Sequence, residues 1–477
     1  MQERGARAPW YASRSLAGMV ALLALAGCAR ALPAVDIRPA AVPGFGSAGQ
    51  PSSGGVRPLA PTERELVLDL VASMPAVESS GARALGVAAE GRDILVQFRD
   101  GQVHDLPGAV RVSSTAVAGL ARYRLSSALD SATLQRWSVA VPLAYAEPVH
   151  HLKVHGRRAQ AVASRVGPGD PGLRTAWGYA RIGAGELWAR SVRPKQPITV
   201  AVIDTGVDAS HPDLRGVVTG GVNLVNRGAA PTDGHGHGTH CAGVIAALAD
   251  NGEGIAGVAA GVRIMPIKAL GDDGSGEDPV LVDALAAAVS GGAKVVSMSL
   301  GTDQDLISVH RAIQSAVAKG VTVVASAGNE SAEKATYPAA YPEVIAVGSS
   351  DLDDMRSTFS NDDVNVRIVA PGEQIYSTVP GGYDYMSGTS MAAPHVAGAV
   401  ALLSTWRPEL GPAGLRDLLV RSGAPAAGFS HGAVLLDLLK TAFDAGLPTG
   451  PLPTPDPNAP SPTPDPGDDG LPGGLPT

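Results

Sequence analysis

Short apolar runs alternate with alanine-rich segments of helical length between residues 170 and 446. The runs at 198–203, 293–298 and 321–325 are rich in β-branched residues, which is typical of strands buried on both faces of a parallel sheet. The alanine-rich segments between them have the length of crossover helices. The pattern therefore predicts an α/β domain with a mostly parallel central sheet over residues 170–446.

A weaker pattern precedes this domain and predicts a small α+β unit over residues 61–166. The stretch 156–169 is basic, polar and contains glycine, so we expect an exposed linker there. The predicted elements of the unit are a helix at 63–73, a strand at 93–98, a helix at 128–137 and a strand at 139–147.

The two ends of the chain differ in composition from these domains. Arginines precede an apolar stretch at 16–26, the arrangement of a secretory signal peptide over residues 1–27. Residues 28–60 are rich in Ala, Pro, Gly and Ser, which is typical of a flexible linker. Residues 447–477 are rich in Pro, Asp and Gly and contain no Lys or Arg, so we expect a disordered tail.

The end of the apolar stretch reads Leu25-Ala26-Gly27-Cys28 and resembles the lipobox of bacterial lipoproteins, in which the cysteine is acylated. The alternative is an ordinary signal peptide with a chance cysteine. The resemblance implies an exported protein that is anchored to a bacterial membrane or the cell surface through Cys28. Acylation would also leave Cys241, the second of two cysteines, without a disulfide partner.

Composition excludes several classes of protein. A net charge of −8 argues against a nucleic-acid-binding protein, since phosphate contacts need a basic face. No apolar run reaches the ~18 residues of a spanning helix, which excludes a polytopic membrane protein. Hydrophobic residues make up 45% of the 477, enough for a sizeable core.

Three separated segments carry candidate chemistry. Asp204 follows a buried strand, where functional groups of α/β sheets gather, although such a residue can also cap a turn. The segment 233–243 holds three histidines in a glycine-rich loop, and the spacing of His235 and His237 also allows a metal site. Ser390 lies where a glycine-containing turn enters an alanine-rich helix; most such serines are N-caps, but a cap does not require Pro394 in the next turn.

Asp204, His237 and Ser390 occur in the order known for subtilisin. The sequences around them are DTGVDASHPDL, GHGTHCAG and GTSMAAPH, and they resemble the three signatures of the subtilisin-like serine proteases, in particular the thermitase and proteinase K branches. The resemblance covers residues 170–440. It implies a three-layer fold with a parallel sheet of seven strands and a serine endopeptidase, without a catalytic metal, that acts on polypeptides as a monomer.

The resemblance also assigns roles. A serine hydroxyl needs a neighbouring base, and His237 matches that base, with Asp204 accepting from its other ring nitrogen. The segment 321–330 resembles the oxyanion-hole segment, in which Asn329 and the backbone N–H of Ser390 would donate; Asn329 could instead be a turn residue. His240 and Cys241 are expected to be packing residues.

Two short stretches match the strands along which relatives bind peptides, and small residues there let a second backbone approach. Ser326 and Thr336 match positions of the primary pocket, and Glu330 its rim. The acidic residues around 272–278 either favour basic substrates or form a solvated face. The predicted substrate-binding residues are Gly274, Ser275, Gly276, Ser299, Leu300 and Gly301.

The polar loop 248–255 resembles the strong calcium loop of the thermitase branch; a solvated loop is the alternative. A second site of that branch lacks its acids here, since 226–230 holds no carboxylate. Residues 61–166 weakly resemble a subtilisin propeptide, although a permanent domain is also possible. The implied calcium ligands are the side chains of Asp170, Asp213 and Asn251 and the carbonyls of Leu248, Glu253 and Ile255.

Overall fold

A computed structural model describes residues 92–127, 129–158 and 169–450 of the chain. The predicted signal peptide, Cys28, the linker 28–60, the helix at 63–73 and nearly all of the tail lie outside these ranges. Within the described ranges, no helix combines the length and the apolar character that a membrane crossing requires.

The first described unit is an antiparallel sheet of four strands in the order β2-β3-β1-β4, with one helix. The predicted strand at 93–98 is confirmed. The helix expected from residue 128 begins at Ser131, and the strand expected from residue 139 begins at Leu143. Asp130 fixes the start of the helix, because its carboxylate accepts from the N–H of Thr133 at 2.7 Å. Phe98, Tyr123 and Trp137 fill a separate small core. The elements are β1 (Asp93–Phe98), β2 (Ala109–Ser114), β3 (Leu120–Leu125), α2 (Ser131–Ala140) and β4 (Leu143–Pro148).

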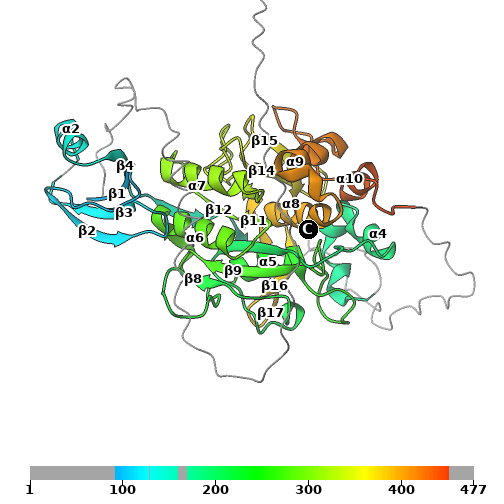
Figure 1. The fold of residues 1–477 in the computed structure, drawn as a ribbon. Helices are drawn as coiled ribbons and strands as arrows, with labels where there is room; N and C mark the ends of the chain where they lie inside the picture. The colour runs from blue at the N-terminus through cyan, green and yellow to red at the C-terminus, as the bar shows by residue number, and fades with distance from the viewer. Residues whose placement is uncertain (1–91, 128, 159–168, 451–477) are drawn as a thin grey trace, which may run out of the picture. The chain divides into compact units, whose positions relative to one another are not determined.

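A nine-stranded sheet forms the centre of the larger domain (Figure 1). Every neighbouring pair is parallel except the one at the β18 edge. The strand count of seven was wrong: the sheet has nine strands, of which three at its edges are two residues long. In sheet order the strands are β18 (Ala424–Pro425), β19 (Val434–Leu435), β15 (Val366–Pro371), β14 (Ile345–Ser350), β13 (Thr322–Ser326), β11 (Val295–Met298), β7 (Thr199–Asp204), β9 (Arg263–Lys268) and β8 (Val222–Asn223).

Helices cover both faces of this sheet, so the predicted three-layer α/β fold is confirmed (Figure 1). Alternate residues of β7 face opposite layers: Val200 and Val202 pack with α5 and α8, whereas Ala201 and Ile203 pack with α6 and α7. The helices are α3 (Trp177–Arg181), α4 (Ala184–Ala189), α5 (His237–Ala246), α6 (Asp278–Ser290), α7 (Ile307–Ala318), α8 (Thr389–Trp406), α9 (Gly411–Ser422) and α10 (Leu438–Asp444), with 3-10 turns η1 (Pro171–Arg174), η2 (Pro212–Leu214) and η3 (Pro408–Leu410).

Two small sheets join the segment before residue 159 to the large domain. Strand β5 (His151–Val154) lies antiparallel between β10 (Ser275–Glu277) and β12 (Leu300–Gly301). Strand β6 (Arg157–Arg158) pairs with β17 (Gly382–Ser387), which also pairs with β16 (Ile375–Val379). The predicted linker is therefore wrong for residues 156–158, because their backbone is engaged; residues 159–168 lie outside the described ranges.

Candidate active site

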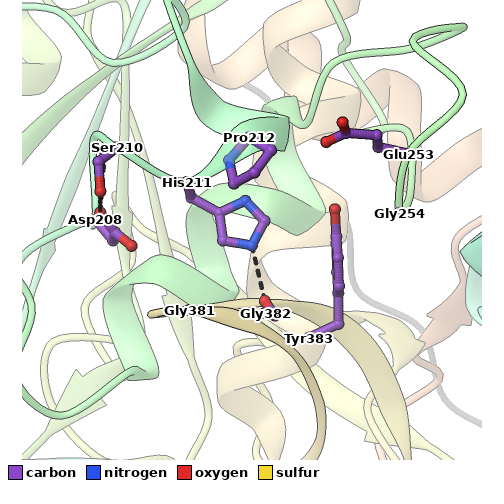
Figure 2. Close-up of a pocket in the computed structure, with 9 residues that line it drawn as sticks. All are labelled: Asp208, Ser210, His211, Pro212, Glu253, Gly254, Gly381, Gly382 and Tyr383. Carbon is purple, nitrogen blue, oxygen red and sulfur yellow. Dashed lines mark hydrogen bonds between the residues drawn. The ribbon is translucent and has the colours of Figure 1, made fainter.

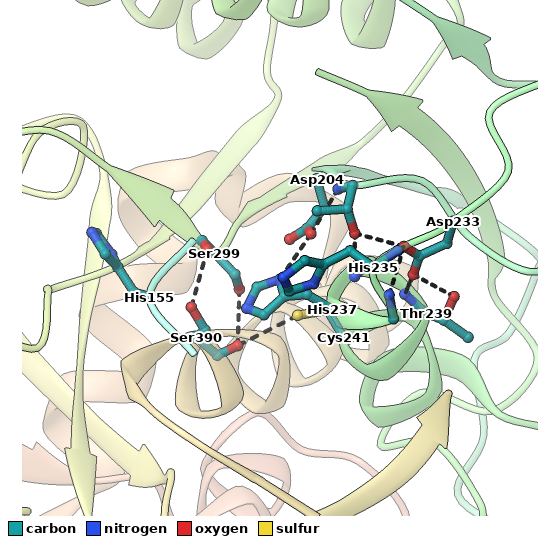
Figure 3. Close-up of polar contacts among 12 residues, drawn as sticks. His155, Asp204, Asp233, His235, His237, Thr239, Cys241, Ser299 and Ser390 are labelled. Carbon is teal, nitrogen blue, oxygen red and sulfur yellow. Dashed lines mark hydrogen bonds and ion pairs between the residues drawn. The ribbon is translucent and has the colours of Figure 1, made fainter. Parts of the chain in front are cut away.

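Asp204 and His237 meet at the carboxyl end of strand β7 of the nine-stranded sheet. Nδ1 of His237 lies 2.8 Å from Oδ1 of Asp204, and that oxygen also accepts from the N–H of Thr205 at 2.7 Å. Both side chains are fully buried. This contact holds the imidazole in one orientation, with Nδ1 toward the carboxylate and Nε2 away from it (Figure 3).

Asp233, which the sequence analysis did not single out, holds the loop before α5 in place. Its carboxylate accepts from the hydroxyls of Thr205 and Thr239 at 2.8 and 2.6 Å, and from the N–H groups of His235, Gly236 and Thr239. The residue is 4% exposed. A carboxylate before a run of free N–H groups at a helix start was the available signal.

Ser390 lies in the first turn of α8, directly after Gly388 and Thr389. Its hydroxyl donates to the carbonyl of Ser299 at 3.0 Å, and its carbonyl accepts from the hydroxyl of Ser299 at 2.9 Å. Nε2 of His237 has no hydrogen-bond partner among the described residues. The structure therefore brings Asp204 and His237 into contact, whereas the hydroxyl of Ser390 is bonded to a carbonyl.

The backbone of residues 151–158 passes directly across these side chains. The N–H of Val154 donates to Gly274 at 3.1 Å and that of His155 to Ser299 at 3.3 Å, each bond ending on a carbonyl. A Cβ at Gly156 would lie 2.7 Å from Nε2 of His237, so only glycine fits this close approach. The predicted edges, Gly274, Ser275, Gly276, Ser299, Leu300 and Gly301, all lie along this segment.

Two donors converge on the carbonyl oxygen of His155. Nδ2 of Asn329 lies 2.5 Å from it and the backbone N of Ser390 lies 3.3 Å from it. The amide of Asn329 is oriented by Thr389, whose N–H and hydroxyl both donate to Oδ1 at 3.0 and 2.9 Å. A Cβ at Gly388 would lie 2.1 Å from the same carbonyl oxygen, which explains the glycine there. This is the donor arrangement that an oxyanion requires.

The histidines of the 233–243 segment do not gather around one point. Nε2 of His240 bonds to the carbonyl of Ile375 at 2.8 Å, and burial lowers the pKa of His240 to about 3. Among the described residues, the one cluster of three His, Cys, Asp or Glu side chains close enough to share a metal ion is Asp204, His237 and Cys241. Burial raises the pKa of the Cys241 thiol well above its ordinary value, so the sulfur stays protonated and is a poor ligand. Cys241 is buried in the core, as a packing residue would be.

The candidate calcium residues form a second polar site. Asp170 accepts from the N–H groups of Asp250, Asn251 and Gly252, and Asp213 accepts from Asn251 Nδ2 at 2.6 Å and from Ile255 N at 2.9 Å. Asp213 is fully buried among neutral donors, and this burial raises its pKa. Leu248, Glu253 and Ile255 lie in the same loop. Asn251 contacts both carboxylates, Asp170 through its backbone N–H and Asp213 through its side-chain amide, so the three residues predicted as side-chain ligands lie together.

A pocket of about 540 Å³ lies beside this loop (Figure 2). The hydroxyl of Tyr383 donates to Asp213 at 3.0 Å, and Nε2 of His211 contacts the carbonyl of Gly382 at 2.7 Å. The pocket does not include Asp204, His237 or Ser390. Its lining residues are Asp208, Ser210, His211, Pro212, Glu253, Gly254, Gly381, Gly382 and Tyr383.

The acidic residues near β10 do not form one solvated face. Asp273 is exposed, but Asp278 is fully buried and accepts from the N–H of His150 at 2.8 Å. Burial raises the pKa of Asp278 to about 8. Glu277 pairs with Arg122 of the small sheet at 2.5 Å. Glu277 and Asp278 therefore contact the N-terminal unit, whereas Asp273 accepts from the hydroxyl of Ser275.

Comparison with known proteins agrees with this geometry. The Subtilase family profile matches residues 195–444. The major intracellular serine protease of Bacillus subtilis is 45% identical over 243 residues, which cover 49% of this chain and 76% of that protein. Thermitase from Thermoactinomyces vulgaris is 41% identical over 50% of this chain and 85% of its own length. Subtilisin DY from Bacillus licheniformis is 42% identical over 46% of this chain and 82% of its own length.

Proposed function

Because the chain belongs to the subtilase family and is a serine-type endopeptidase that acts on polypeptides, we propose that it cleaves them with Ser390, His237 and Asp204. Ser390 would attack the carbonyl carbon while His237 takes the hydroxyl proton and passes it to the leaving nitrogen. Asp204 would stabilise the imidazolium, and water would then hydrolyse the acyl-enzyme. Asn329 and the N–H of Ser390 would bind the oxyanion.

One observation carries this proposal. The carbonyl oxygen of His155 accepts from Asn329 Nδ2 and lies 3.3 Å from the N of Ser390, while Gly156 lies against Nε2 of His237. A peptide bond of the chain itself therefore lies beside the amide of Asn329, the backbone N–H of Ser390 and the imidazole of His237. We therefore propose that the His155–Gly156 bond is the one that the enzyme cuts during maturation. A serine attack there would leave His155 as a C-terminal carboxylate and Gly156 as a new N-terminus.

The contacts of the N-terminal unit support an inhibitory role for the part of residues 61–166 that precedes the proposed cut. Glu147 is 6% exposed and accepts from the N–H groups of Ile307 and Ser308 at the start of α7, at 2.8 and 3.0 Å. Asp283 accepts from the N–H of Ala116 at 2.5 Å. With this unit held in place, strand β5 occupies the position between β10 and β12 where a peptide substrate is predicted to bind. N-terminal sequencing and intact mass of the purified chain test the proposal, which expects a mature chain that begins at Gly156; a mature chain that begins elsewhere contradicts it.

We further propose that Ca²⁺ is held by Asp170, Asp213 and Asn251 with carbonyls of the 248–255 loop, where it would neutralise the buried carboxylates. Excess chelator is then expected to lower the melting temperature, and added Ca²⁺ to restore it, because a ligand that binds only the native state stabilises it by mass action. At free Ca²⁺ 100 times its Kd the stabilisation is about 2.7 kcal/mol.

The Asp213→Asn variant is the control for this calcium prediction. Its melting temperature should be lower and should no longer respond to chelator, since one charged ligand is lost while the shape is kept. If the melting curve of the wild type is unchanged in chelator, the proposed calcium site is contradicted.

The proposal of export rests on the signal-peptide pattern of residues 1–27, and that of lipid anchoring rests on Leu25–Cys28; both lie outside the described residues. We propose that Cys28 carries the lipid and that the enzyme works as a monomer at a bacterial membrane or cell surface. The Cys28→Ser variant should move from the detergent phase to the aqueous phase, because acyl chains supply the membrane affinity. A wild-type protein that already partitions into the aqueous phase contradicts this prediction.

A further inference from the structure

The side chain of His155 fills a buried pocket beside the proposed catalytic groups. It is 4% exposed, and its Nδ1 lies 2.9 Å from Oγ of Ser326 on β13. Gly301 also lies close to the ring, because a Cβ at this position would lie 2.4 Å from Cε1 of the imidazole and 2.6 Å from Oγ1 of Thr336. Figure 3 shows His155 beside Ser299 and Ser390.

Ser326 is the pocket hydroxyl that contacts this ring. Thr336, the other hydroxyl nearby, donates to the carbonyl of Ala327 at 3.3 Å instead. Glu330 at the rim accepts from Nδ2 of Asn361 at 2.8 Å. The pocket thus has a glycine close to the ring and one hydroxyl, that of Ser326, within hydrogen-bond distance of Nδ1. Such a site discriminates against a residue of similar shape that leaves its buried polar group unpaired.

We propose that the enzyme prefers histidine, as the neutral imidazole, on the acyl side of the scissile bond, and that Ser326 determines this preference. The inference rests on the proposed function, because it takes His155 as the enzyme's own substrate residue. It differs from a preference for basic residues, which Glu330 would favour through its charge.

The protonation state of the bound ring follows from its surroundings. Burial lowers the pKa of His155 to about 4, against an ordinary value near 6.5. Glu330 favours the charged ring, whereas His237 and Lys153 disfavour it. A histidine in a free peptide must therefore lose its proton to enter the pocket. As pH falls through about 6.5, the share of peptide that is ready to bind decreases, and at pH 5.5 it is about one tenth.

The test uses quenched peptides with the sequence of residues 151–158, in which position 155 is His, Phe or Lys. The ratio of kcat/KM for the His and Phe peptides is expected to exceed one and to fall about tenfold between pH 7.5 and 5.5, since the titration of His237 affects both peptides and cancels. This arm needs no variant. In Ser326→Ala the ratio should fall about tenfold at pH 7.5, as for a lost hydrogen bond in a buried site.

Thr336→Val is the matched control, because it removes a pocket hydroxyl that does not contact the imidazole, and it should leave the ratio unchanged. A Phe peptide cleaved as well as the His peptide, a Lys peptide cleaved best, or an unchanged ratio in Ser326→Ala each overturns the inference while the protease function stands. Failure of the wild type to cleave any of the peptides overturns the proposed function and the inference together.

Discussion

Replacement of Ser390 by alanine is expected to leave the chain as one uncut species, while the wild type yields a mature chain that begins at Gly156. The alanine cannot attack the carbonyl of His155, although Asn329 and the backbone N–H still bind its oxygen. Peptide hydrolysis should fall about 10⁶-fold, a magnitude taken from the triad serine of subtilisin, to which this chain is related. Intact mass of both proteins, expressed and purified in parallel, measures the cut.

The fold of this variant should be retained, which makes the comparison clean. The hydroxyl of Ser390 donates to Ser299 O at 3.0 Å, and loss of one such bond costs about 1 kcal/mol. Its melting temperature can be compared with that of the wild type in the presence of a serine-directed inhibitor. Processing of the alanine variant at the same bond would mean that another protease makes the cut. An uncut wild type that hydrolyses peptides would make residues 61–166 a permanent domain.

Sequence alone predicted the larger domain because its signals are local. The apolar run before Asp204 and the alanine-rich stretch after Ser390 each determine one element, β7 and α8. Each of the three signatures lies at the end of one element: Asp204 ends β7, His237 begins α5, and Ser390 lies in the first turn of α8. Asp204 ends β7 and Asn329 follows β13, so both lie at the carboxyl edge of the parallel sheet.

The course of residues 151–158 could not be predicted in the same way. Strands β5 and β6 are four and two residues long, and all their partners lie more than 100 positions along the chain. A short polar stretch with glycine has the local pattern of a linker, and its extended form comes from β10, β12 and β17. The burial of Asp278 could not be predicted either. It lies in an acidic stretch that would ordinarily be exposed, but it is buried and accepts a hydrogen bond from the N-terminal unit.

The Asn329→Ala variant separates binding from catalysis. The amide of Asn329 donates to the substrate carbonyl, and this hydrogen bond becomes stronger when the oxygen becomes charged in the transition state. Its loss should therefore lower kcat about 10²–10³-fold with little change in KM. The size of this loss is known from the corresponding asparagine of subtilisin and is carried over to this relative. Steady-state kinetics on the peptide of residues 151–158 measure both constants.

Thr389→Ser provides the matched control for Asn329→Ala. Threonine 389 orients the amide through its hydroxyl at 2.9 Å from Oδ1 and also accepts from the N–H of Gly328 at 3.1 Å. Serine keeps both bonds, so kcat should stay within a few fold of the wild type. If Asn329→Ala raises KM and leaves kcat unchanged, Asn329 binds the ground state and the transition state equally, and the extra stabilisation of the oxyanion would come from the N–H of Ser390 without it.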